Sequence, residues 1–192
     1  MPPKPIVSRD DVLNAAISLI REHGSQYVNA RSIAGVLNCS TKPLFRVYKN
    51  MEELKDDMYA KALEYHSSFL KSNEVDENDV FLSVGANYIQ FANKEKELFK
   101  YLFLSNYMRF RNLDELADLP DTRDLVEYLA VSTGLRKEAA RGLFLELWLL
   151  AHGIATMIAT NPCTLDDREI KRLLANAFNA KYKHLKSEGH PQ

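Results

Sequence analysis

The chain has 192 residues, of which 46% are apolar and 27% are charged. These fractions are typical of a globular protein, and they exclude an intrinsically disordered, collagen-like or disulfide-rich chain. Lys and Arg together number 25 and Asp and Glu 26, so the net charge of -1 gives the whole chain no attraction for nucleic acids or membranes. Any binding of a polyanion must therefore come from a local excess of positive charge.

Cysteine content and hydropathy favour a cytoplasmic protein. Cys39 and Cys163 lie far apart in the sequence, which suits neither a zinc site nor a disulfide framework. The first eight residues hold three prolines and no apolar run, so they are not a signal peptide. The most hydrophobic stretch, residues 142–159, is interrupted by Glu146 and His152 and is shorter than the roughly 20 apolar residues that cross a bilayer. We expect a buried helix there, and we expect no membrane partner, cofactor or metal site.

The spacing of apolar residues predicts an all-helical chain. They recur every three or four positions, Gly and Pro number seven each, and no Asn-Gly or Asp-Gly hairpin turn occurs. Ser8 and Asp11 form a capping-box pattern, and Gly24 ends the helix that follows. In the second half of the chain the expected helices occupy residues 78–93, 95–109, 121–132, 136–160 and 165–186, with a less regular connection at 112–120.

Two short helices are expected after the first one. Asn29 can cap a helix in which Ile33, Val36 and Leu37 face inward. Asn38 then stands where the chain must turn sharply, and Asn is the non-glycine residue that best tolerates a left-handed backbone.

The next short helix is expected to run from a Ser40 cap to Tyr48. Pro43 suits its first turn, because a backbone N–H there has no partner within the helix. Asn50 then caps a longer helix. Two short helices joined by a tight turn, with another helix packed across them, are the parts of a helix-turn-helix module that reads DNA.

This predicted module is the positively charged part of the chain. Residues 1–51 hold seven Lys and Arg against three Asp and Glu, a net charge of +4, so the remaining 141 residues carry -5 of the total of -1. Thr41, Lys42 and Pro43 stand where a helix N-terminus favours a phosphate, and Arg46 and Lys49 lie further along the same helix. Arg and Lys bind guanine or phosphate, and the Thr methyl can contact thymine. Solvated charges on three amphipathic helices are the alternative interpretation.

The order of residues between positions 9 and 54 matches a known pattern. The matching segments are Val12-Leu13, Ala15-Ala16, His23-Gly24, Val28, Arg31-Ser32-Ile33-Ala34, Ser40, Leu44-Phe45-Arg46-Val47-Tyr48 and Asn50-Met51-Glu52-Glu53-Leu54. This stretch, about a quarter of the chain, resembles the DNA-binding domain of the TetR family of bacterial transcriptional regulators.

Three positions depart from the family pattern. Asn38 replaces the usual Gly in the turn, Phe45 replaces a usual Tyr, and Met51 replaces a usual Lys. The Tyr and the Lys are associated with the DNA backbone in the family, so this chain lacks one hydroxyl and one charge there. Fewer phosphate contacts predict weaker and less salt-sensitive binding of DNA.

The resemblance implies a homodimeric repressor that a small-molecule effector releases from a palindromic operator in double-stranded DNA. We expect residues 1–50 to form an arm and the helix-turn-helix domain, 51–72 a connecting helix, and 73–192 a helical domain for effector binding and dimerisation. An effector in that domain is expected to change the angle between the two DNA-binding domains. The residues expected to engage DNA are Arg31, Ser40, Thr41, Lys42, Pro43, Phe45, Arg46, Tyr48 and Lys49.

Aromatic residues crowd the segment 88–110. At helical spacing they are typical of a core, but buried phenol groups need polar partners, which also fits a ligand pocket. Trp148 and His152 are likewise typical of a core, but they also fit a ligand pocket. The candidate pocket residues are Tyr88, Phe91, Phe103, Tyr107, Trp148 and His152.

The predicted helix 136–160 carries an apolar stripe too broad for a single neighbour, and the predicted helix 165–186 adds further apolar residues. The resemblance implies that they form a four-helix dimer interface, which would set the two recognition helices about 34–36 Å apart on DNA. No glycine-rich phosphate loop, His-Glu-x-x-His or Gly-x-Ser-x-Gly pattern occurs, so no catalytic residue is assigned. Two alternatives remain: a helical interaction module with impaired DNA binding, and an enzyme whose site is assembled from distant helices.

Overall fold

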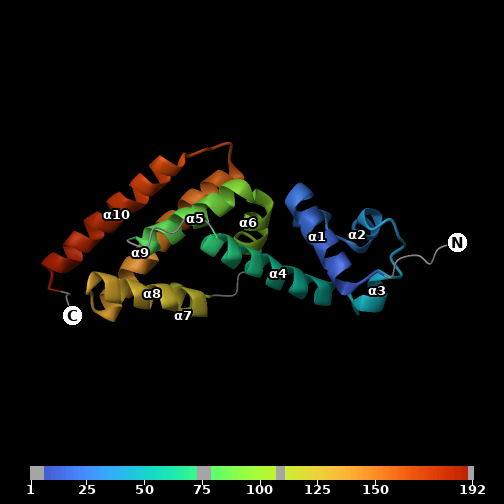
Figure 1. Ribbon diagram of the computed structural model, residues 1–192, viewed down its shortest axis with the longest axis horizontal. Helices are drawn as coiled ribbons and strands as arrows, with labels where there is room; N and C mark the ends of the chain where they lie inside the picture. Colours follow the sequence, from blue (N-terminus) through green and yellow to red (C-terminus); the bar gives the residue numbers. More distant parts are fainter. Residues whose placement is uncertain (1–6, 73–78, 107–110, 190–192) are drawn as a thin grey trace. The chain divides into compact units, whose positions relative to one another are not determined.

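The computed structural model describes residues 7–72, 79–106 and 111–189, and its regular elements in these ranges are helices (Figure 1). This confirms the expected all-helical fold. The α-helices are α1 (Arg9–His23), α2 (Ala30–Val36), α3 (Leu44–Val47), α4 (Met51–Ser72), α5 (Val80–Lys94), α6 (Lys96–Phe103), α7 (Leu113–Asp118), α8 (Pro120–Thr133), α9 (Lys137–Thr160) and α10 (Asp167–Ser187), with a short 3-10 helix at Ser25–Tyr27.

Contacts divide the chain into two compact units. The N-terminal unit comprises the chain through Ser68 together with the segment from Glu95 that contains α6, and the C-terminal unit comprises Phe69–Lys94 together with α7 to α10. The division differs from the boundaries expected at residues 50 and 72, because α6 packs on α1 rather than with the C-terminal helices. Pairing of distant helices leaves no local trace in the sequence.

Local caps fix the first two helices of the N-terminal unit as expected. The Ser8 hydroxyl accepts from the Asp11 N–H at 3.1 Å, and the Asp11 carboxylate accepts from the Ser8 N–H at 2.9 Å, so the capping box of α1 is complete. Asn29 caps α2 by accepting from two backbone N–H groups. Asn38 has φ 51°, which places the left-handed residue in the turn that follows α2, as predicted.

The third helix differs from its prediction. It begins at Leu44 with Pro43 as its N-cap and has no side-chain cap, so the expected Ser40 cap is wrong.

The second helix, α2, buries fewer residues than expected. Val36 is 48% exposed and Leu37 is half-buried, because the seven-residue α2 buries a stripe that consists of Ile33 and its neighbour Ala34.

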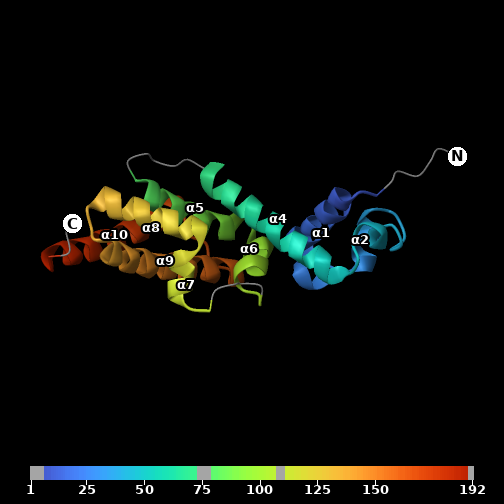
Figure 2. The ribbon, with the colours of Figure 1, turned by 90° about the horizontal axis from the view of Figure 1, so that it is seen from below.

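In the C-terminal unit α9 is the central helix and contacts α5, α7, α8 and α10. Figure 2 shows α8 and α9 running side by side. Among the described residues α9 is the one helix long and apolar enough to cross a membrane, a property shared by the core helices of soluble proteins. Four buried residues of α9, Ala140, Leu143, Phe144 and Leu147, pack in a core with the buried residues of α8 and with Ala117, Leu135 and Leu185.

The segment 112–120 is a helix, α7, rather than the expected irregular connection. The Asn112 side chain caps it by accepting from the Glu115 N–H at 2.9 Å. Arg141 of α9 then binds the Asp118 carboxylate at 2.5 Å and the Asp114 carbonyl oxygen at 2.7 Å. A six-residue helix depends on such contacts with a distant helix, and these are not visible in its own sequence.

Stability of the N-terminal unit is expected to decrease between about pH 6.5 and pH 4 because of His66. This side chain is buried on α4 with its ring 5.0 Å from that of Phe103, and burial lowers its pKa to about 4. The unfolded chain takes up a proton near pH 6.5, so in this window the unfolded state binds more protons and the free energy of unfolding falls as pH falls, by about 3 kcal/mol. Urea unfolding at a series of pH values measures this loss.

The control for His66 is the exposed His23. His66→Phe should flatten the pH dependence relative to the parent protein, since carboxylates contribute equally to both, and His23→Phe should leave it unchanged. Equal pH profiles for the parent and His66→Phe would show that His66 is not the group responsible.

Candidate nucleic-acid interface

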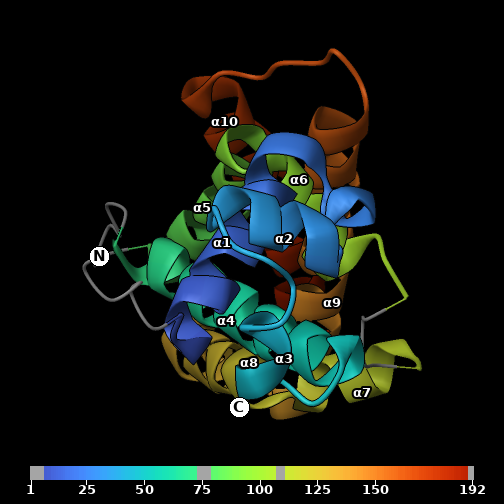
Figure 3. The same ribbon diagram turned by 90° about the vertical axis from the view of Figure 1, so that its right-hand side faces the viewer.

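The α2–α3 segment is held against α1 by a small apolar core. Ile33 of α2 is fully buried and Leu44 of α3 is 1% exposed, and both helices contact α1. Figure 3 shows α2 and α3 in front of α1 when this end of the N-terminal unit faces the viewer. Two short helices carried on a third helix are the frame of a helix-turn-helix module.

Four cationic side chains on this segment point to solvent. Arg31, Lys42, Arg46 and Lys49 are all exposed. Elsewhere in the same unit Arg9 and Arg21 are instead engaged by carboxylates. Residues 29–50 contain no Asp or Glu, so this stretch of the N-terminal unit carries a net positive charge that is open to a polyanion.

Arg9 ties the end of α3 to the start of α4. Its guanidinium donates to Asp57 at 2.9 Å, to Glu53 at 2.8 Å and to the Val47 carbonyl oxygen at 3.1 Å, and it lies 4.1 Å from the centre of the Tyr48 ring. The hydrogen bond from Arg9 holds the pKa of Asp57 below its usual value. The backbone N–H of Lys49 is the main cause of a lowered pKa at Glu53, with Arg9 second.

Tyr48 is part of this Arg9 cluster rather than a DNA contact. Its side chain is 1% exposed, its hydroxyl donates to Asp57 at 3.0 Å, and burial raises its pKa to about 12. The expectation that Tyr48 engages DNA is therefore corrected. Tyr48 instead positions the end of α3 from the buried side of this helix. Its place in an apolar pattern that includes Leu44 was the signal that pointed to the core.

The other predicted DNA residues lie on or beside α2 and α3. Ser40 is exposed, Thr41 and Pro43 are half-buried, and the Phe45 ring is 47% exposed. An apolar ring at this position offers contact with a sugar or a thymine methyl, but it cannot donate a hydrogen bond to phosphate.

Three of the predicted ligand residues form one cluster in the C-terminal unit. The Tyr88 hydroxyl lies 2.8 Å from Nδ1 of His152, and the His152 ring stacks on Trp148 with 4.7 Å between ring centres. Burial raises the pKa of Tyr88 and lowers the pKa of His152. Both groups are therefore neutral, and the hydrogen bond between them is a satisfied polar contact.

The remaining predicted ligand residues do not join this cluster. Phe91 is fully buried against Phe69, with ring centres 5.3 Å apart, and is a core residue. Phe103 belongs to the N-terminal unit, where it contacts His66 and Phe99. Tyr107 lies outside the described residues. The single aromatic pocket expected from the sequence is thus not assembled by these side chains.

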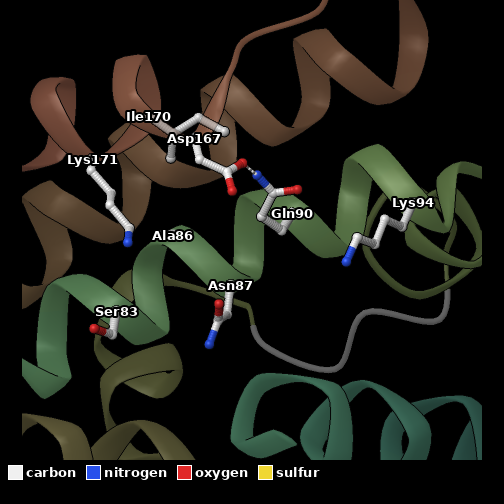
Figure 4. A pocket seen from close by; sticks show the side chains of 8 residues that line it. All are labelled: Ser83, Ala86, Asn87, Gln90, Lys94, Asp167, Ile170 and Lys171. Atoms are coloured by element: carbon white, nitrogen blue, oxygen red, sulfur yellow. Dashed lines mark hydrogen bonds between the residues drawn. The ribbon is translucent and has the colours of Figure 1, made fainter. Parts of the chain in front are cut away.

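A cavity does exist in the C-terminal unit, but polar side chains line it. It has a volume of about 370 Å³ and opens between α5 and α10 (Figure 4). The density of aromatic residues predicted a pocket at other side chains. Polar residues recur every three or four positions along the otherwise apolar α5, and this spacing was the signal in the sequence that could have indicated the cavity. The lining residues are Ser83, Ala86, Asn87, Gln90, Lys94, Asp167, Ile170 and Lys171.

Comparison with known proteins gives matches in structure but not in sequence. No protein-family profile and no curated protein matches the chain. A transcriptional regulator from Rhodococcus sp. RHA1 aligns over 93% of this chain and 97% of its own, with a TM-score of 0.67 and 12% identity.

Two further solved structures are described as TetR-family proteins. One from Pseudomonas syringae aligns over 91% of this chain and 95% of its own, with a TM-score of 0.60 and 15% identity. One from Vibrio parahaemolyticus aligns over 90% and 97%, with a TM-score of 0.55 and 19% identity. The chain therefore has the fold of the TetR-family transcriptional regulators.

Proposed function

We propose that this protein is a DNA-binding transcriptional regulator that works as a homodimer and represses until a small molecule releases it from its operator. The observation that carries the proposal is the set of four exposed cations on the α2–α3 segment, Arg31, Lys42, Arg46 and Lys49, within this fold. A helix-turn-helix reads DNA by placing its second helix in the major groove while neighbouring groups bind phosphates. Lys42 lies two residues before that helix, and Arg46 lies within it.

The salt dependence of DNA affinity tests this proposal. Four cations in each protomer allow at most about eight phosphate contacts per dimer, so the plot of log affinity against log salt should be no steeper than about -7. Met51→Lys restores a charge at the start of α4 and should raise affinity and steepen the slope by about 1 per protomer. Fluorescence anisotropy with a labelled duplex at several salt concentrations gives both values.

A matched control adds the same charge elsewhere in the N-terminal unit. Leu104→Lys, at the end of α6, should leave the slope unchanged because this position is far along the chain from the cationic residues 31–49, whereas Met51 lies two residues after them. Absence of binding to any duplex at low salt, or equal effects of the two lysines, would contradict the proposed interface.

An open stripe on α9 supports the homodimer. Leu149 is 46% exposed and Met157 is 42% exposed, and both share a helix face with Gly142 and Gly153. A Cβ added at either glycine would meet nothing within 4 Å, so a partner backbone can approach there. Exposed apolar side chains next to glycines suit a helix-to-helix interface between two copies.

Leu149→Glu is expected to convert the dimer to a monomer, because a carboxylate at the centre of this stripe is costly to desolvate. Sedimentation equilibrium measures the change. Leu113→Glu introduces the same charge at an exposed leucine of α7 and should leave the dimer intact. A parent protein that is monomeric at micromolar concentration, or a dimer that survives Leu149→Glu, would contradict an interface at this stripe.

A second candidate function is an interaction module that has lost DNA binding. The observation in its favour is that Val36 on α2 and Phe45 on α3 expose apolar surface, 48% and 47% respectively, on the segment that would face DNA. Failure of the folded dimer to bind duplex DNA at low salt would favour this function.

A further inference from the structure

The cavity between α5 and α10 is lined by one face of each helix. Ser83, Asn87, Gln90 and Lys94 recur every three or four residues along α5, and the start of α10 contributes Asp167, Ile170 and Lys171. Its volume of about 370 Å³ falls in the range of small-molecule sites, about 300–1,000 Å³.

The lining combines positive charge with buried polar groups. Lys94 and Lys171 are exposed at opposite ends of the cavity, and Figure 4 shows the Gln90–Asp167 pair between them. The Gln90 amide donates to the Asp167 carboxylate, so the one acidic group of the lining already has a partner. Ser83 and Asn87 are buried, and the Asn87 amide donates to the Leu70 carbonyl oxygen at 3.1 Å, which fixes its orientation.

We propose that this cavity binds a small, linear organic dicarboxylate, with one acid group held by Lys171, the other by Lys94, and its chain lying along Ala86 and Ile170. The inference rests on the proposed function in one respect, since it names the effector class of the regulator. A net positive lining selects an anion, and two ammonium groups at opposite ends favour a molecule with acid groups at both ends over a compact one.

Lys94, at one end of the cavity, directly precedes a residue that makes contacts within the N-terminal unit. It ends α5, and its ammonium lies 5.5 Å from the centre of the Phe69 ring. The next residue, Glu95, accepts from Arg21 of α1 at 2.8 Å and from the Tyr65 hydroxyl at 2.9 Å.

Isothermal titration with succinate, adipate and sebacate tests the inference, with adipamide as the neutral analogue and glycerol phosphate as a phosphate-bearing anion. At least one dicarboxylate should bind and raise Tm, and adipamide should not. Lys171→Gln and Lys94→Gln should each weaken binding by about tenfold, the value of one charge-assisted contact. Lys183→Gln makes the same change at an exposed position of α10 outside the cavity and should have no effect.

Each other outcome overturns the inference. Binding of none of the three dicarboxylates, tighter binding of glycerol phosphate, or an equal loss with Lys183→Gln would exclude a carboxylate site in this cavity. Duplex binding by the same samples separates the two proposals. A protein that binds DNA but no dicarboxylate retains the proposed function without this effector site, and one that binds adipate but no DNA retains the site without the function.

Discussion

Arg46→Ala should weaken operator binding by roughly 10- to 100-fold, the loss expected when an arginine contact to a base or phosphate is removed. Arg46 lies on α3, is exposed, and forms no ion pair in the described part of the chain. Its removal therefore breaks no ion pair of the described chain, and the expected loss is that of the proposed DNA contact. Anisotropy titration of the operator duplex and a thermal unfolding curve measure the two effects separately.

A control variant and a control measurement accompany this prediction. Arg123→Ala removes the same side chain from an exposed position of α8 and should leave operator affinity within about twofold, since surface changes away from the site are nearly neutral. Tm and the dimer should be unchanged in both variants. Equal affinity of Arg46→Ala and the parent would remove Arg46 from the interface.

Phe91→Ala should lower the free energy of unfolding by about 3–5 kcal/mol, the cost of removing a fully buried phenyl group and leaving a cavity. Phe91 has no exposed surface and packs against Phe69. Urea unfolding measures the loss, and the transition of the C-terminal unit should carry it.

Phe45→Ala is the matched control because it makes the same chemical change at a ring that is 47% exposed. It should change stability by no more than about 0.5 kcal/mol. A stability change of similar size in both variants would contradict the assignment of Phe91 to the core. If Phe91→Ala has normal stability but binds ligand more weakly, Phe91 is a pocket residue rather than a core residue.

Features that depend on neighbouring residues were predictable from the sequence. The Ser8–Asp11 capping box, the Asn29 cap and the left-handed Asn38 each need a few adjacent residues, and all three occur in the structure. The same holds for the positive charge between residues 31 and 49, because charge is a property of composition.

Features that depend on distant contacts were not predictable. Tyr48 is buried because Arg9 and Asp57, which lie 48 residues apart, meet on its ring and its hydroxyl. The cavity exists because α5 pairs with α10, and aromatic spacing carries no trace of that pairing. A pattern on one helix indicates which face is apolar but not which helix covers it.

Selection of bound fragments from a genomic DNA library by the purified protein, at two salt concentrations, is the most direct test of the central claim. If the protein is a dimeric regulator, the retained fragments will share an inverted repeat whose half-sites are about one helical turn apart, with enrichment that decreases at the higher salt. Folded, dimeric protein that retains no common sequence at low salt would contradict it.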